Sequence, residues 1–84
     1  MPFKFQLASD VIRDGMGCEL LSEDGEVIAE VFRSDRDHEV VVSMFKDEVP
    51  LDAMEALFAR ARSRLDPFES GDALDTAKNF GAPR

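Results

Sequence analysis

The chain has 84 residues and a net charge of −8, from eighteen acidic and ten basic side chains, with one cysteine. A chain of this length forms one domain with a thin core, and a lone cysteine excludes an intrachain disulfide and an all-cysteine zinc site. The acidic balance disfavours direct binding to nucleic acid and to anionic membranes, both of which favour clustered Lys and Arg.

A hydrophobic fraction of 44% predicts a folded protein in spite of the 33% of residues that are charged. The first ten residues, MPFKFQLASD, lack a charged segment followed by a long apolar run, so they do not predict a signal peptide. No uninterrupted apolar stretch approaches the roughly 20 residues that cross a bilayer. We therefore expect a cytoplasmic protein with no membrane partner.

Alternating and β-branched segments predict the strands. In MPFKFQLA, Phe3, Phe5 and Leu7 alternate with polar residues. The next segment, SDVIRDGMG, is rich in turn residues, and we expect Gly15 and Gly17 to interrupt regular structure there. The runs GCELLS, EVIAEVFR and HEVVVSMFK, separated by EDG and SDRD, predict an antiparallel meander of three strands, which the first segment is expected to join.

The segment 50–65, PLDAMEALFARARSRL, predicts an amphipathic helix, which Asp66 and Pro67 end. Pro50 suits the first helical position. The expected fold is thus an α+β domain over residues 1–68, with the helix packed on one face of the meander. Residues 69–84 are expected to form a tail that is weakly helical or disordered. The apolar stripe of the helix is predicted to contain Leu51, Met54, Phe58, Ala61 and Leu65.

Burial predicts the register of the sheet. A two-residue turn at Asp24 and Gly25 sets Glu19 opposite Glu30 on an exposed face, at a cost of roughly 0.2–1 kcal/mol. A three-residue loop would instead bury Glu19, which costs several kcal/mol. With a loop over residues 34–37, the second hairpin gains one apolar face. That face is expected to pair Val31 with Val40, Ala29 with Val42 and Val27 with Met44, and the first turn adds Cys18 and Leu20 to it.

The stretch FRSDRDHE contains the only histidine and invites a metal or catalytic interpretation. Counted from Asp35, the sixth and twelfth positions are Val40 and Lys46, where a calcium loop needs Gly and a carboxylate. Cys18 and His38 could form a nucleophile and base, but a lone cysteine in a small core is usually a buried hydrophobe. We predict a hairpin loop, no catalytic, metal-binding or cofactor-binding residues, and no enzyme activity.

The other face of the sheet is predicted to carry five large apolar side chains among glutamates, an exposed patch of roughly several hundred Å². Either the chain covers it, with the amino-terminal segment or with Phe68, Leu74 and Phe80, or it binds a second copy of the chain or another protein. The residues of this predicted protein-binding face are Leu21, Ile28, Phe32, Val41 and Phe45.

Two functions remain open at this point. The first is a small non-enzymatic protein-interaction or regulatory module, with a homodimer as one form. The second is an acidic neutralising protein, such as an antitoxin, an immunity factor or a nucleic-acid mimic, that binds a basic partner. The acidic stretch from Asp10 to Glu55 motivates the second function and predicts salt-sensitive binding.

The run GEVIAEVFRSD…VVVSMFKDEVPLDAMEALFARARSRLDPF resembles short uncharacterised bacterial proteins, in which strands, an apolar segment and a Val-Pro or Leu-Pro step precede a closing helix. The resemblance extends over residues 17–68 and concerns the texture of the sequence, without a chemical motif. It implies a bacterial cytosolic origin and no particular activity.

Overall fold

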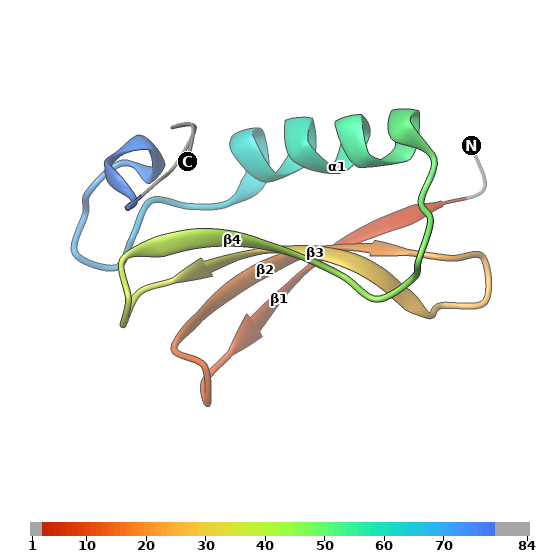
Figure 1. The fold of residues 1–84 in the computed structure, drawn as a ribbon. Helices are drawn as coiled ribbons and strands as arrows, with labels where there is room; N and C mark the ends of the chain where they lie inside the picture. Colours follow the sequence, from red (N-terminus) through yellow and green to blue (C-terminus); the bar gives the residue numbers. More distant parts are fainter. Residues whose placement is uncertain (1–2, 79–84) are drawn as a thin grey trace.

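A computed structural model describes residues 3–78 and shows a four-stranded antiparallel meander followed by one helix (Figure 1). The predicted α+β fold is confirmed, and the first strand joins the sheet next to the second. The elements are β1 (Lys4–Asp10), β2 (Gly15–Leu21), β3 (Val27–Ser34), β4 (Glu39–Met44), α1 (Leu51–Arg64) and a short 3-10 helix, η1 (Leu74–Thr76).

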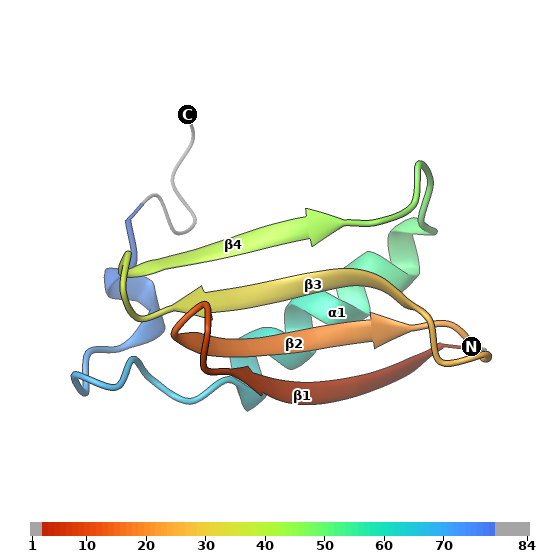
Figure 2. The same ribbon diagram turned by 90° about the horizontal axis from the view of Figure 1, so that it is seen from below.

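The molecule has two layers. α1 lies across one face of the sheet, where it packs over β2 and β3 (Figures 1 and 2). Apolar side chains of the two middle strands fill the space beneath it, and the strand residues Leu20 and Ala29 and the helix residue Leu57 are fully buried. Phe3, Phe5 and Met16 pack at the margin of this core. β1 and β4 therefore form the two edges of the sheet in the described part of the chain.

The β2–β3 hairpin has the predicted pairing of Cys18 with Val31 and of Glu19 with Glu30. The predicted two-residue turn is wrong, because the backbone N–H of Ser22 donates to the carbonyl oxygen of Glu26 and closes a loop of three residues, 23–25. The pairing shifts after Leu20, because Leu21 lies opposite Val27 and Ile28 is an extra residue in β3. A bulge of this kind changes the direction in which the neighbouring side chains point. Ile28 consequently joins the core cluster beneath α1, and its predicted place on the opposite face is wrong.

β2 starts at Gly15 and contains Gly17, so the expectation that these glycines interrupt regular structure is also wrong. Gly17 lies opposite Phe32, and Gly15 lies opposite Ser34. An added Cβ at Gly15 would overlap the carbonyl oxygen of Arg33 and lie 2.6 Å from Phe32 Cζ. The missing side chains therefore give the side chains of β3 room to lie flat against the strand.

The β3–β4 pairing differs from the prediction by two residues. Val31 lies opposite Val42, and Ala29 lies opposite Met44. The loop is residues 35–38, because Ser34 stays in the strand and accepts a hydrogen bond from the backbone N–H of Asp37 (3.2 Å) while His38 takes a left-handed backbone with φ of 53°. A shift of two keeps each side chain on its face, so the predicted one-sidedness of Ala29, Val31, Val40, Val42 and Met44 survives the error. The predicted pairing of Val27 with Met44 is wrong, because Val27 lies beyond the bulge, opposite Leu21.

The helix starts one residue after Pro50, which is its N-cap. Its buried side contains Ala53, Met54, Leu57 and Ala61, and Leu65 directly after the helix is also buried. The predicted stripe is thus correct for Met54, Ala61 and Leu65 and wrong for the other two residues. Leu51 is 76% exposed and Phe58 is 40% exposed, because the helix is rotated toward its small alanines, which allow close approach to the sheet.

The segment after α1 returns to the end of the sheet near the β3–β4 loop (Figure 2). The buried guanidinium group of Arg33 donates hydrogen bonds to the carbonyl oxygens of Asp66 and Pro67. The ring of Phe68 is buried and stacks on the ring of His38 at 4.0 Å between centroids. The backbone N–H of Lys78 then donates to the carbonyl oxygen of His38 (3.0 Å), beside the first residue of β4.

Candidate protein-binding surface

The five residues predicted to form one exposed apolar face have two different environments. Leu21, Ile28 and Phe32 are buried, whereas Val41 is 39% exposed and Phe45 is 55% exposed. The expectation of a single exposed plane is therefore wrong for the first three. Of the suggested covering residues, Phe3, Phe5 and Leu74 pack against the core under α1, which includes Ile28. Phe68 is buried against His38, Leu7 is 47% exposed, and Phe80 lies outside the described residues.

An arginine covers the middle of this face. The guanidinium carbon of Arg13, in the β1–β2 connection, lies 3.9 Å from the centre of the Phe32 ring, which is only 3% exposed. A cation over an aromatic face is attracted by the ring and also shields it from water. Gly15 gives this ring its space. The strand-interior glycines were the sequence signal for this close packing.

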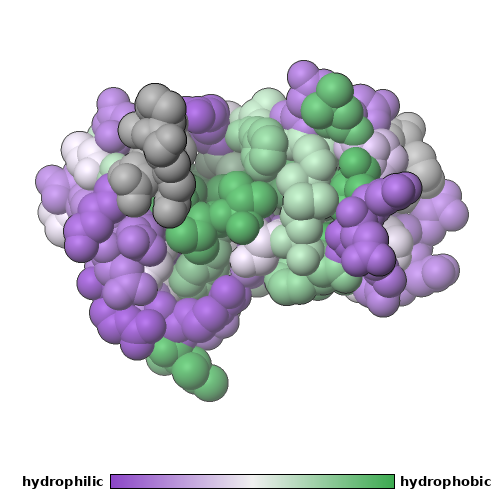
Figure 3. Space-filling view, in the orientation of Figure 1, coloured by the Kyte–Doolittle hydropathy of each residue, from purple (hydrophilic) through white to green (hydrophobic). Residues whose placement is uncertain are grey.

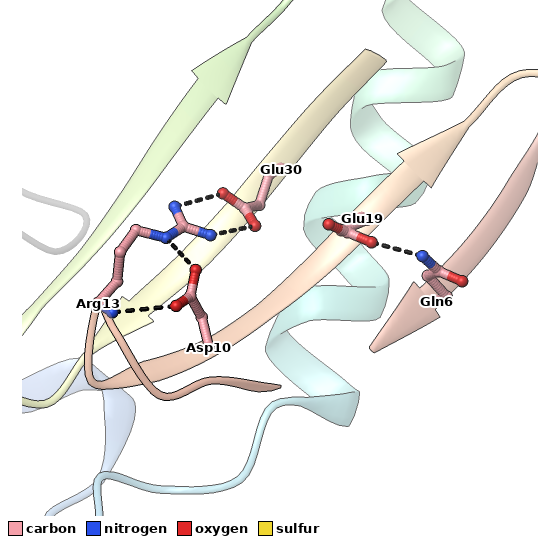
Figure 4. Close-up of polar contacts among 5 residues, drawn as sticks. All are labelled: Gln6, Asp10, Arg13, Glu19 and Glu30. Atoms are coloured by element: carbon pink, nitrogen blue, oxygen red, sulfur yellow. Dashed lines mark hydrogen bonds and ion pairs between the residues drawn. The ribbon is translucent and has the colours of Figure 1, made fainter. Parts of the chain in front are cut away.

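The same arginine joins two carboxylates (Figure 4). Its two terminal nitrogens donate to the carboxylate oxygens of Glu30 at 3.0 and 2.9 Å, and its Nε donates to Asp10 at 2.6 Å. The hydrogen bonds to Glu30 and Asp10 raise the pKa of Arg13, and its backbone N–H and guanidinium lower the pKa of Asp10. Glu30 is buried, which the prediction of an exposed Glu19–Glu30 pair did not foresee, and Gln6 donates a hydrogen bond to Glu19.

β4 has no comparable cover in the described part of the chain. On its helix side Val42 and Met44 are each 49% exposed, although their neighbours Val31 and Ala29 on β3 are buried. On its other side Val41 and Phe45 are exposed. Figure 3 shows apolar side chains gathered along the front of the molecule, over β4 and below α1. We call Val41, Val42, Met44 and Phe45 the β4 patch.

The helix extends this apolar area. Leu51 and Phe58 are seven residues apart and thus lie on one flank of α1. Arg60 and Arg64 lie on the other flank, because they line a cleft together with residues of β1. Since β1 and β4 are opposite edges of the sheet, the flank with Leu51 and Phe58 faces the β4 side.

Two hydrogen bonds reveal which backbone groups of β4 point away from the sheet. The N–H of Phe45 donates to the carbonyl oxygen of Ile28 in β3, and the carbonyl oxygen of His38 accepts from Lys78 on the opposite side. Because backbone direction alternates along a strand, the groups of Val40, Val42 and Met44 point to the outer edge. Lys78 occupies the start of this edge, where it faces Glu39 and donates to His38, so within residues 3–78 the edge is open along Val42 and Met44.

The cleft beside β1 has a volume of about 250 Å³ and is lined by Arg60 and Arg64, with Phe5, Leu7 and Cys18. Arg60 lies 4.3 Å from the centre of the Phe5 ring. Cys18 is buried, and this burial raises the pKa of its thiol. A nucleophilic cysteine requires a lowered pKa, so the environment of Cys18 does not favour nucleophilic catalysis.

Three carboxylates meet near the β1–β2 and β3–β4 loops. Oxygens of Asp14, Asp35 and Glu69 lie within 4.8 Å of one another. Both oxygens of Asp35 already accept hydrogen bonds, one from Arg33 and one from the backbone N–H of Glu69. Since Arg33 neutralises Asp35 at 3.0 Å, the cluster resembles a loop anchor more than a cation site.

His38 likewise has a structural position. Its Nε2 lies 2.9 Å from the hydroxyl of Thr76, and its ring stacks on Phe68. It closes the hairpin loop and contacts the carboxyl-terminal segment, while Cys18 lies under the helix in β2. The sequence interpretation of FRSDRDHE as a hairpin loop agrees with this arrangement.

No protein-family model, curated protein or solved structure matches the chain. None of the helices in residues 3–78 is both long and apolar enough to cross a bilayer. A function must therefore be inferred from the surface of the chain.

Proposed function

We propose that this chain is a non-enzymatic protein-interaction module that pairs with a second chain along the outer edge of β4. The observation that carries the proposal is the coincidence of outward backbone groups on Val40, Val42 and Met44 with the exposed side chains of the β4 patch. An uncovered apolar edge strand is a template for strand addition. Its N–H and C=O groups supply affinity, and its side chains add buried apolar area.

A second copy of the chain fits this edge. An antiparallel pair of β4 strands about a twofold axis places Val42 opposite itself and Val40 opposite Met44. These residues all direct their backbone groups outward, as strand pairing requires. Residues 40–45 contain no charged side chain. Two acidic molecules can thus meet along this strip without placing like charges opposite each other, which would destabilise the pair.

The helix side of the pair strengthens the argument. Val42, Met44 and the flanking Phe58 are half exposed in the single chain. Strand pairing brings the same three side chains of a second copy toward them and removes apolar surface from water at roughly 25 cal/mol per Å². The predicted interface on the face opposite α1 is therefore replaced by one centred on the edge, which retains Val41 and Phe45 from the original five residues.

Sedimentation equilibrium over a range of protein concentrations tests the proposal. We expect a reversible dimer, and we expect Val42→Lys to weaken it at least tenfold because a lysine on an edge strand opposes pairing. Ala59→Lys is the matched control, because Ala59 is exposed on α1 and the charge change is identical. The dimer should tighten as salt is added, since salt screens the repulsion between two acidic molecules.

The proposal is wrong if the wild-type chain is monomeric at every concentration, or if both lysine variants change the dimer equally. The cytoplasmic location and the bacterial origin stay predictions from the sequence.

A further inference from the structure

A second exposed apolar feature lies at the end of the β1–β2 hairpin. Val11 and Ile12 are each 92% exposed, more than any other large apolar residue in the described part of the chain. An apolar projection extends beyond the polar surface at this end of the molecule (Figures 1 and 3). We call Val11 and Ile12 the tip. Since they are almost fully exposed, they contribute nothing to the core.

The tip is held in a fixed shape by its neighbours. The backbone N–H of Arg13 donates to Asp10 Oδ1 at 3.0 Å, and its Nε donates to Asp10 Oδ2 at 2.6 Å. The backbone N–H of Asp14 donates to the carbonyl oxygen of Val11, and the carbonyl oxygen of Asp14 accepts from Asp35. Arg13 also reaches Glu30 in β3. The loop is thereby tied to β3 and to the β3–β4 loop.

Turn residues are usually polar or glycine, and this turn could fold with polar residues at both tip positions. Two rigid, β-branched side chains on a fixed loop lose little conformational entropy when they are buried by a partner. Burial of each one is expected to change affinity by roughly tenfold or more. Such a pair has the properties of an interface anchor.

Negative charge beside the tip favours a basic partner protein. Arg13 pairs with Asp10 and Glu30, and Arg33 pairs with Asp35. Asp14 and Glu69, whose carboxylates lie close to Asp35, form no ion pair within residues 3–78. Their negative charge is available at the base of the tip. It repels an acidic protein or an anionic lipid surface and attracts lysine and arginine.

We propose that the tip inserts into an apolar pocket, flanked by lysine or arginine, on a basic partner protein. This site is separate from the β4 edge and does not depend on dimer formation. Its electrostatics are also opposite: added salt should weaken the tip complex and strengthen the dimer.

The test places a photoreactive diazirine amino acid at position 12 of the full chain, with position 59 as the control site. The probes are the cation-exchange-bound and the unbound fractions of an extract of the source organism, phosphatidylcholine vesicles, and the purified chain itself. We expect an adduct from position 12 with a protein of the cation-exchange-bound fraction. It should disappear at roughly 1 M salt, where the screening length is about 3 Å.

Two competitors separate the apolar contribution from the charge contribution. Excess wild-type chain should abolish the adduct, whereas Val11→Ser/Ile12→Ser should compete at least tenfold less well. Asp14→Asn/Glu69→Gln should compete several-fold less well and show a shallower salt dependence. Asn suits the positive φ of 55° at position 14, so this variant is expected to fold, and circular dichroism checks both variants.

The proposal is supported only if the crosslinked peptide of the partner maps to an apolar pocket beside Lys or Arg. It is overturned by an adduct chiefly with the unbound fraction, with vesicles or with a second copy of the chain. It is also overturned by equal adducts from positions 12 and 59, or by the absence of an adduct from position 12.

Discussion

The sheet has two regions that differ in the exposure of their large apolar residues, which are buried in one and half exposed in the other. Over β2 and β3, the ring of Phe32 is buried beneath Arg13, which in turn pairs with Glu30 and Asp10. Over β4, the side chains of Val42 and Phe45 remain half exposed. Both regions consist of β-branched and aromatic residues, so composition does not distinguish them. Arg13 covers the first region, whereas the side chains of the second region stay exposed.

The difference shows how a small domain can separate stability from binding. The closed region uses glycines to let Phe32 lie flat and an arginine to shield it, which contributes to folding. The open region leaves an apolar edge exposed, which the proposed dimer would bury. Perturbation of the closed region should therefore change the free energy of unfolding, and perturbation of the open region should change association.

Gly15→Ala should have the largest effect. Its Cβ would overlap a backbone carbonyl oxygen of β3 and press against the Phe32 ring, neither of which can move freely. We expect a loss of about 2–4 kcal/mol in the free energy of unfolding, measured by urea denaturation.

Gly17→Ala is the comparison for this variant. Its Cβ would lie 2.5 Å from Glu30 Oε2, a side-chain atom that can shift at the expense of its hydrogen bond with Arg13, whereas the Cβ at position 15 meets backbone. The loss should be smaller than for Gly15→Ala. Equal losses would contradict the view that Gly15 is required for the close approach of β3.

Arg13→Met should have the next largest effect. Methionine retains apolar cover for Phe32, but it leaves the buried carboxylate of Glu30 without its cation. Because the Arg13 side chain is 46% exposed, water moderates the cost, and we expect about 1–2 kcal/mol in urea denaturation. Arg13→Met/Glu30→Gln should recover part of the loss. Strictly additive effects of the two single substitutions would show that the pair is not coupled.

These variants also show what the sequence could and could not predict. β-branched runs separated by turn residues predicted the meander, and a spacing of three to four residues predicted the helix, because these patterns reflect burial directly. The β3–β4 register was wrong by two residues, because Ser34 and His38 adjust the loop in ways that composition does not reveal. The preserved faces explain why the fold prediction survived.

The environment of the predicted protein-binding face was harder to predict from the sequence than the fold. Burial of Phe32 depends on Arg13, which is nineteen positions earlier in the chain, and no local pattern links the two residues. Gly15 and Gly17 were the available signal, since glycine inside a strand often marks a close approach. The bulge that moves Ile28 into the core has no comparable signal in its neighbours.

Phe45→Ser tests the open region and should have little effect on stability. Phe45 is 55% exposed and follows β4, so the expected change in the free energy of unfolding is within about 0.5 kcal/mol. The dimer should weaken, because the side chain adds apolar area next to the paired strands. Measurement of unfolding at a concentration below the dimer dissociation constant separates the two effects. A loss of stability in the monomer close to that of Arg13→Met would remove the distinction between the regions.

The smallest expected effect is a change in the pH dependence of stability at acid pH. In the folded chain, Arg13 lowers the pKa of Asp10 below its usual value of 3.8. The contribution of this contact to the free energy of unfolding is therefore present above about pH 4 and is lost as the pH falls through the lowered folded value. Urea denaturation between pH 5 and pH 2 should therefore show a shallower loss of stability for Asp10→Asn than for wild type. Asp47→Asn, an exposed substitution beyond β4, should follow the wild-type slope. Residues 40–45 carry no titratable group, so the dimer affinity measured over the same pH range should respond only to net charge. A change in dimer affinity that disappears in Asp10→Asn would show that the closed and open regions are coupled.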